Sequence, residues 1–352
     1  MLFIIIAILV FGVLIAVHEF GHFTAAKLLG VRVNEFSIGM GPTILKKQGK
    51  VTKYSLRAFP IGGFCAMEGE DEASDDPEAF TSQPVWKKLI ILCAGAFMNF
   101  LVGFIIVLVL FLPGKQYTAP VIGGFLEGFP YEGENGLMAG DRIVSIDGEK
   151  IYAYDDISTF LRRGDYTYDI VIKRGGEKLK LSHFELIPQE YEFNGQTGKS
   201  FGFYLTNKNA GLLKNVELSW LKTRQFVRLV RLGLSDLIKG NASVKDLSGP
   251  VGIVSYMSDV GNSAESASEA AYSIAFLCAF IAVNLAVMNM LPIPALDGGR
   301  VFFLIITWAA EKISRRKIDP KYEGYIHAAG LVLLLGLTAF VMFNDVLRII
   351  HK

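Results

Sequence analysis

The sequence predicts a polytopic α-helical membrane protein with four transmembrane helices and one inserted, extracytoplasmic β-rich module. Hydrophobic residues make up 51% of the 352 positions, charged residues make up 20%, and the mean hydropathy is +0.39. A soluble chain of this length normally carries about 25% charge. Much of the apolar content is therefore expected to face lipid. The formal net charge of +1 gives no basis for nucleic-acid binding.

Four segments are long and apolar enough to span a hydrocarbon core of roughly 30 Å. We expect the spans at 1–29, 89–112, 270–310 and 326–347, and the third is uncharged from 270 to 296. The first could also be a signal peptide, but it lacks a basic start and a small-residue cleavage site, and charged residues interrupt it. We therefore predict that it is a transmembrane helix.

The loops between the spans carry the residues that set the orientation. Lys and Arg are concentrated in 30–88 and in 311–325, whereas the residues before the first uncharged run carry none. By the positive-inside rule both loops are cytoplasmic. The two termini and the long 113–269 segment are then predicted to lie outside.

A metal-binding pattern lies within the first span. His18-Glu19-Phe20-Gly21-His22 is an H-E-x-x-H sequence. On a helix the two imidazoles project from one face, one turn apart, which suits two Zn–N bonds, and Glu19 can act as general base toward water. Two buried histidines satisfied by backbone groups are the alternative, but ionisable side chains in a membrane helix are costly without a function. We predict that His18 and His22 bind zinc.

A catalytic zinc needs a third protein ligand, and Asp297 is the best candidate. It is the only acid close to the inner end of the third span, where Pro292 and Pro294 break the helix. His18 lies about 24 Å along its own helix, at a similar depth. An ordinary helix-ending Asp-Gly-Gly turn is the alternative. Scattered cysteines and the remaining histidines are less suitable by position (Cys65, Cys93, Cys278, His183, His327 and His351).

Three sets of residues carry a resemblance to a known family: 18–22, the turn Leu296-Asp297-Gly298, and Gly95-Ala96-Phe97-Met98-Asn99. They resemble the site-2 protease family of intramembrane zinc metalloproteases, peptidase family M50, in its sigma-E branch, and the likeness covers nearly the whole chain. Gly-Ala replaces the family's Gly-Pro, and Ala-Leu-Asp-Gly replaces its Asn-Pro-Asp-Gly; neither change removes a ligand. The resemblance implies a zinc endopeptidase in which His18, His22 and Asp297 hold Zn²⁺ and Glu19 is catalytic.

Three amides lie within the predicted spans: Asn99 in the second, and Asn284 and Asn289 in the third. The resemblance implies that Asn284 and Asn289 bind the substrate backbone beside the zinc. Asn99 shares a helix face with Gly95. Gly95 would permit close approach of another helix, and the Asn99 amide could steady the oxyanion or the scissile carbonyl. Interhelical hydrogen bonding and simple packing are the alternatives.

Residues 51–68 are typical of two short strands around Pro60-Ile61-Gly62-Gly63 on the cytoplasmic side. They resemble the family's membrane-associated β-hairpin. A substrate helix hides its peptide bonds, so pairing an extended segment with a strand edge near Gly62 and Gly63 would expose the scissile carbonyl. A solvated hairpin without a catalytic part is the alternative.

The outside segment resembles a single bacterial PDZ domain at 113–188, with strands alternating around Gly-Asp and Asp-Gly turns. A β-domain of unspecified role is the alternative. In this family such a module either captures a peptide or filters substrates by the size of their outside portion. Residues 189–269 are predicted as its C-terminal region, with a basic amphipathic helix at 216–239 on the outer membrane surface rather than in the core of the module.

These features together predict an intramembrane zinc endopeptidase of a bacterial inner membrane, with its active site near the cytoplasmic face. Its expected substrates are single-span membrane proteins whose outside domain has been removed, either an anti-sigma factor or a signal-peptide remnant. A membrane-anchored metallopeptidase acting on soluble polypeptides and a non-enzymatic PDZ scaffold are the alternatives. The lipid bilayer is the other expected partner, and the sequence leaves the oligomeric state open.

Overall fold

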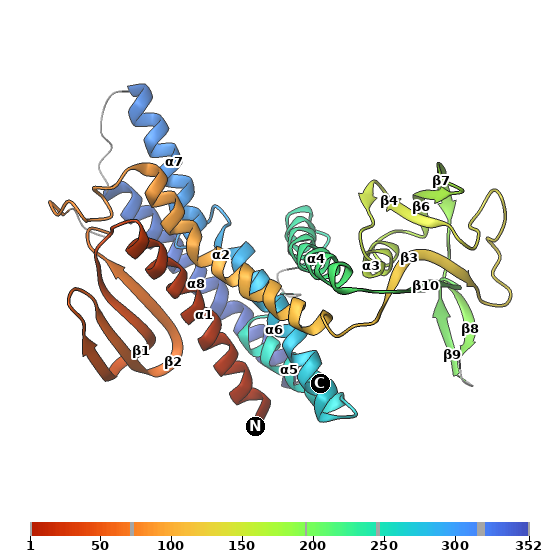
Figure 1. Cartoon of the computed structure of the whole chain (residues 1–352), viewed down its shortest axis with the longest axis horizontal. Helices are drawn as coiled ribbons and strands as arrows, with labels where there is room; N and C mark the ends of the chain where they lie inside the picture. Colours follow the sequence, from red (N-terminus) through yellow and green to blue (C-terminus); the bar gives the residue numbers. More distant parts are fainter. Residues whose placement is uncertain (1, 71–73, 194–195, 244–246, 315–320, 351–352) are drawn as a thin grey trace. The chain divides into compact units, whose positions relative to one another are not determined.

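The computed structural model describes residues 2–70, 74–193, 196–243, 247–314 and 321–350 (Figure 1). The chain divides into two compact units. The first contains Met1–Val107 and Phe226–Lys352, and the second contains Leu108–Gln225. The first unit holds the long apolar helices and a β-hairpin, and the second is rich in strands.

Among the described residues, four helices are long and apolar enough to cross a membrane. These spans are Phe3–Leu28, Val85–Phe111, Ala267–Asn289 and Gly324–Arg348, within α1 (Leu2–Leu28), α2 (Val85–Phe111), α6 (Ala267–Asn289) and α8 (Lys321–Ile350). Each is apolar around most of its circumference, which is typical of a helix that faces lipid rather than water. The prediction of four apolar spans is confirmed.

The third predicted span consists of two helices. Ser266 begins α6, because its hydroxyl accepts a hydrogen bond from the Glu269 backbone N–H at 3.2 Å. This helix ends at Asn289, shortly before Pro292 and Pro294, and α7 (Asp297–Ser314) begins after them. A non-helical turn therefore separates α6 from α7.

The hairpin consists of β1 (Val33–Gln48) and β2 (Lys53–Met67), joined by a turn in which the Gly49 N–H donates to the Thr52 carbonyl at 2.9 Å. Residues of β1 pair with both halves of β2: Ile38 lies opposite Gly63 and also opposite Leu56. The prediction of two short strands around 60–63 is wrong, because β2 runs continuously through these residues and both of its halves pair with β1 instead of with each other. This pairing places residues 63–67 along one edge of 33–38.

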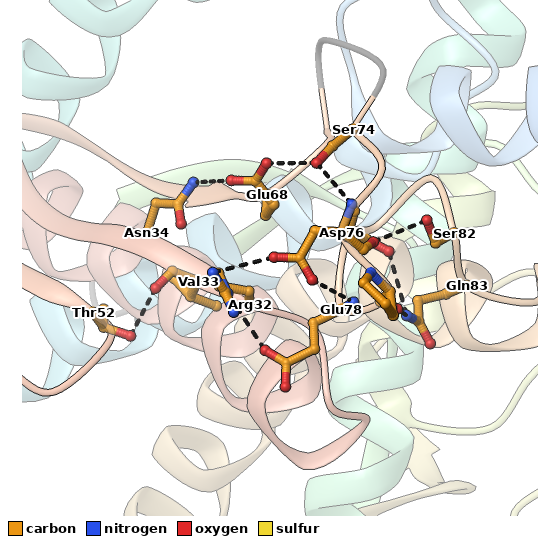
Figure 2. Close-up of polar contacts among 12 residues, drawn as sticks. Arg32, Val33, Asn34, Thr52, Glu68, Ser74, Asp76, Glu78, Ser82 and Gln83 are labelled. Atoms are coloured by element: carbon orange, nitrogen blue, oxygen red, sulfur yellow. Dashed lines mark hydrogen bonds and ion pairs between the residues drawn. The ribbon is translucent and has the colours of Figure 1, made fainter.

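The segment after β2 is held to the start of β1 by a polar network (Figure 2). Arg32 forms ion pairs with Asp76 at 3.1 Å and Glu78 at 3.4 Å, and the Asn34 amide donates to Glu68 at 2.8 Å. Hydrogen bonds from Asn34 and Ser74, with the larger effect from Asn34, lower the pKa of the Glu68 carboxyl. This network fixes the end of β2 relative to the beginning of β1.

The second unit contains antiparallel β-structure with a short helix. Its main sheet has the strand order β10-β3-β4-β6-β7, with β5 paired to β4, and β8 and β9 form a separate hairpin. The elements are β3 (Gln116–Phe125), β4 (Arg142–Ile146), β5 (Glu149–Lys150), α3 (Tyr154–Leu161), β6 (Thr167–Arg174), β7 (Glu177–Glu185), β8 (Gln189–Phe193), β9 (Gln196–Ser200) and β10 (Phe203–Asn209). Alternate residues of β6 are buried in its apolar core, namely Tyr168, Ile170 and Ile172. On β4 the buried residues are Ile143 and Ile146, which lie on either side of an irregularity in the strand register. A β-rich portion is therefore present between α2 and α4.

Two more helices complete the chain. The helix α4 (Leu212–Lys239) passes from the second unit into the first, where Phe226 packs edge-on against Phe276 and Phe280 of α6. The helix α5 (Pro250–Ser263) follows, and the Asp345 carboxylate of α8 accepts a hydrogen bond from the Gly252 N–H at 2.8 Å near its start. That contact ties α5 to the last span.

Candidate metal centre

The two histidines of the H-E-x-x-H sequence and Asp297 lie together. His18 and His22 are one turn apart on α1, both are buried, and their Nε2 atoms are 3.1 Å apart. Asp297, the first residue of α7, places Oδ2 3.0 Å from Nε2 of His18 and 3.3 Å from Nε2 of His22. Residues nearly 280 positions apart in the sequence therefore converge on one point.

The three ligand atoms have the spacing that zinc requires. Donor atoms about 2.0–2.2 Å from a tetrahedral zinc lie roughly 3.3 Å from one another. The three separations of 3.0, 3.1 and 3.3 Å match that spacing. Two imidazoles and one carboxylate are also a known catalytic donor set, which leaves a fourth position for water or substrate. These residues fit a catalytic zinc ion.

Two glycines make room for the cluster between α1 and α2. A Cβ atom at Gly95 would lie 2.3 Å from Nε2 of His22 and 2.8 Å from Nε2 of His18. A Cβ at Gly21 would lie 2.4 Å from the Ala94 carbonyl oxygen. The close approach expected at Gly95 is present, and its partner is the pair of imidazoles as much as the neighbouring helix.

Each imidazole has a partner on its far nitrogen. The Nδ1 atom of His22 lies 2.8 Å from the Ile91 carbonyl oxygen, which accepts its proton and leaves Nε2 available. The Nδ1 atom of His18 lies 3.4 Å from the Asn289 amide nitrogen. The oxygen and nitrogen of an amide are interchangeable by rotation, so the Asn289 oxygen can accept the Nδ1 proton when Nε2 binds a metal. Asn289 therefore contacts Nδ1 of His18, the ring nitrogen that does not face the other two ligand atoms.

The turn that carries Asp297 is tightly enclosed. A Cβ at Gly298 would lie 2.3 Å from the Met290 carbonyl carbon, and one at Gly299 would lie 2.2 Å from the Ile293 carbonyl oxygen. Ala295 has a positive φ of 73°, and its N–H donates to Nδ1 of His327 on α8 at 3.0 Å. Because L-residues rarely adopt this conformation, the enclosure must hold it in place.

An ion pair connects the same turn to the end of the hairpin. Arg300, one turn after Asp297, pairs closely with Glu70, and the Met67 N–H donates to Glu70 at 3.3 Å. The Asp297 helix and the last residues of β2 are therefore linked by one carboxylate.

Glu19 lies beside the hairpin. A Cβ at Gly63 would lie 3.4 Å from Cγ of Glu19, and a Cβ at Gly12, two turns earlier on α1, would lie 2.4 Å from the Pro60 carbonyl oxygen. The bend of β2 thus runs along α1 up to the glutamate. Gly62 has a φ of 96°, which fits its place in this bend.

The remaining predicted residues differ in their surroundings. Asn99 is buried on α2, 1% exposed, and among the described residues its Oδ1 has no hydrogen-bond partner. Asn284 is half-buried on α6 and, within the part of the chain that the structure describes, makes no hydrogen bond to His18, His22 or Asp297. The structure therefore brings Asn289, but not Asn284, into contact with a histidine of the cluster.

Sequence reasoning missed several residues that build this site. It did not assign a role to Gly21, to the Glu70–Arg300 pair or to Gly330, whose added Cβ would lie 2.3 Å from Cβ of Pro294. His327 was considered only as a ligand. The available signal for these roles was the spacing of His327 and Gly330, which lie three residues apart on the last span and therefore share a helix face.

The described residues thus include four apolar spans and a cluster of two buried histidines with the partly buried Asp297, which together indicate a membrane metalloprotease. The chain belongs to peptidase family M50, the site-2 protease family, whose model matches residues 6–337. It is 34% identical to a Fusobacterium nucleatum relative over 99% of both chains. It is 27% identical to the regulator of sigma-W protease RasP of Bacillus subtilis, with 97% of each chain covered, and 27% identical to the zinc metalloprotease RasP of Bacillus licheniformis, with 97% of this chain and 98% of the relative covered. The protein is therefore a multi-pass, zinc-dependent intramembrane protease.

Proposed function

We propose that this protease cleaves single-span membrane proteins inside the bilayer, with zinc held by His18, His22 and Asp297. The observation that carries the proposal is the convergence, at 3.0–3.3 Å, of two histidine nitrogens from an apolar span and a carboxylate oxygen of Asp297 on α7. A zinc ion bound there would act as a Lewis acid that lowers the pKa of water to about 7 and polarises the scissile carbonyl.

The protein's own residues supply the proton transfers. Glu19 takes a proton from the attacking water and delivers it to the leaving nitrogen. The Ile91 carbonyl and the Asn289 amide hold His22 and His18 in the orientation that directs Nε2 inward. The buried amide of Asn99 is available to steady the carbonyl oxygen as charge develops on it.

The hairpin presents the substrate as an extended strand. Residues 63–67 pair with 33–38 on one side, and Gly63 lies against Glu19. A substrate segment that adds to the other edge of 63–67 would be unwound from its helix beside the general base. Larger side chains at Gly62 or Gly63 would obstruct this edge.

The substrate class is a membrane protein shortened by an earlier cleavage, either an anti-sigma factor or a signal-peptide remnant. The relationship to RasP, named a regulator of sigma-W protease in B. subtilis, supports this class. Lys and Arg in the 30–88 and 311–325 loops support an orientation in which the termini and the β-rich unit lie outside and the metal centre lies toward the cytoplasm.

The β-rich segment at 113–188 acts as a PDZ-type module that screens substrates by the bulk of their outside portion. Its antiparallel strands and short helix α3 support this assignment. The amphipathic pattern of α4 within 216–239 supports contact with the outer membrane surface, although Lys222 and Arg224 contact Asp155 and Tyr152 of the β-rich unit.

The decisive variant is Glu19→Gln, tested with a model single-span substrate in liposomes. We expect zinc content to stay at the wild-type level, because Glu19 is not a ligand, and cleavage to fall by at least about 10³-fold. Unchanged cleavage would overturn the mechanism. Cleavage of soluble polypeptides alone by the wild-type protein would overturn the substrate class.

A further inference from the structure

The last span, α8, contacts the turn at 290–296 between α6 and α7, although the three candidate ligand atoms come from α1 and α7. Nδ1 of His327 accepts a hydrogen bond from the Ala295 N–H at 3.0 Å. Three residues later on α8, a Cβ atom at Gly330 would lie 2.3 Å from Cβ of Pro294. The last span therefore touches this turn both with its backbone and with a polar side chain.

The backbone N–H groups of the turn have different partners. Its two prolines have no N–H group, and Ile293 and Leu296 donate to carbonyls of the turn itself at 2.7 Å and 3.2 Å. The Ala295 N–H donates instead to His327 on another helix. A non-helical N–H beside apolar helices needs a partner within the protein, because leaving it unpaired is costly. The imidazole supplies that partner.

Ala295 also adopts a conformation that is unfavourable for an alanine. Its φ is 73°, and positive φ brings Cβ close to backbone atoms in every residue except glycine. Such a conformation persists only when surrounding contacts hold it. The hydrogen bond to His327 fixes the peptide plane that precedes Ala295, so it opposes rotation back to negative φ.

The position of Asp297 depends on this conformation, because Asp297 lies only two residues after Ala295. Consecutive Cα atoms are about 3.8 Å apart, so a rotation at Ala295 displaces the carboxylate by several ångströms. Zinc–ligand distances vary by only about 0.2 Å. The imidazole of His327 also packs edge-on against Phe303 of α7, with the ring centroids 5.5 Å apart. His327 therefore contacts the chain on both sides of Asp297.

We infer that His327 is a positioning residue for the zinc ligand Asp297. Its Nδ1 atom holds Ala295 in the conformation that directs the Asp297 carboxylate toward the two histidines of α1. The inference rests on the proposed metal centre and gives the last span a part in setting zinc affinity. The Nδ1 lone pair accepts the Ala295 proton, so this nitrogen acts on the metal only through the turn.

The first experiment measures zinc affinity, by competition with a chelator, in the full chain purified in detergent. His327→Leu removes the acceptor at similar volume and should weaken zinc binding by at least about tenfold, as expected for a group that orients a ligand. His327→Asn should restore most of the affinity, because its amide oxygen can accept the same hydrogen bond, whereas an amide is not a usual zinc ligand. Tyr325→Leu is the matched control: Tyr325 is 72% exposed on the same helix, and its loss should leave the affinity unchanged.

The second experiment tests the strained conformation with Ala295→Gly. Glycine adopts positive φ without strain, so Ala295→Gly alone should bind zinc at least as tightly as the wild type. In this background His327→Leu should weaken zinc binding by no more than about threefold, because the turn no longer depends on the hydrogen bond. The absorption spectrum of Co²⁺ bound in place of zinc reports ligand geometry. It should change in His327→Leu and return toward the wild-type spectrum in His327→Asn and in the double variant.

Equal zinc affinities for His327→Leu and Tyr325→Leu would overturn the inference. A loss that neither His327→Asn nor Ala295→Gly restores would also overturn it, because that pattern indicates lost packing rather than a lost hydrogen bond. If His327→Leu does not fold, His327→Phe replaces it, since this variant keeps a ring against Phe303 but has no acceptor. Normal zinc content in Asp297→Ala would instead refute the proposed metal centre, so the two failures are distinguishable.

Discussion

The first unit, which holds the membrane-spanning helices (the membrane unit), and the second unit, which is rich in strands (the β-rich unit), bury polar groups for different purposes. In the β-rich unit, Asp141 is 1% exposed and is paired with Arg174, whose guanidinium also donates to two carbonyl groups, so the pair closes a loop onto the sheet. In the membrane unit, three ligand groups face one another across α1 and α7. The first arrangement satisfies its own charges, whereas the second is suited to a cation. A substitution should therefore affect stability in one unit and zinc binding in the other.

The largest effect is expected from Gly95→Ala. The new Cβ would occupy the space of both Nε2 atoms, so zinc binding should weaken by about a hundredfold or more and cleavage should be lost. Gly336→Ala on α8, where a Cβ meets nothing within 4 Å, is the control. Zinc titration of the two purified variants in detergent measures the difference. Equal zinc affinity would show that Gly95 does not shape the site.

The corresponding change in the β-rich unit is Arg174→Leu. It leaves the buried Asp141 carboxylate without its cation, which should destabilise this unit by about 3 kcal/mol while zinc content stays constant. Lys180→Leu removes only the exposed ion pair with Asp169 and should leave the stability of this unit nearly unchanged. Hydrogen exchange of the β4 and β6 amides in the full chain compares them. Loss of zinc in Arg174→Leu would break the distinction between the units.

Within the metal centre, Asn289→Ala should have a moderate effect. Removing the amide behind His18 should lower zinc affinity by about tenfold, because the imidazole loses the group that orients it. Asn284→Ala is the matched control, since among the described residues this amide makes no hydrogen bond to the cluster. Isothermal titration of zinc would separate the two. Equal losses would indicate a general packing effect of amides on α6.

The smallest effect concerns the hairpin, through Glu35. Burial raises the pKa of its carboxyl, but hydrogen bonds from Ser55, Arg57 and Lys53 outweigh burial and lower the pKa from 4.5 to about 2. Since the folded-state pKa is depressed, the stabilisation is complete above pH 4.5 and is lost as the pH falls toward 2. Protection of hairpin amides should decline over this window in the wild type. In Glu35→Gln the decline should be smaller, and an unchanged decline would assign it to other carboxylates.

The sequence predicts the parts of the site that depend on local periodicity. Two histidines at i and i+4 must share a helix face, and the two prolines after Asn289 must end α6 before Asp297. These rules bring the ligands to the same depth without any knowledge of packing. The family resemblance implied the same three ligands, and the structure brings these residues together.

Long-range packing set the features that the sequence left open. Nothing in the residues around Gly298 or Gly330 specifies that each touches the turn at 290–294. The pairing of both halves of β2 with 35–38 depends on register between segments that the alternating pattern cannot rank. Likewise, the contact of Asn289 with His18 joins two helices whose relative rotation only the folded structure defines.

The most direct test of the account is the zinc content of Asp297→Ala compared with the wild type, both purified in detergent. The account predicts about one zinc per chain in the wild type, and in the variant a loss of most of this zinc together with cleavage of the single-span substrate. Full zinc retention with normal cleavage in Asp297→Ala would contradict it.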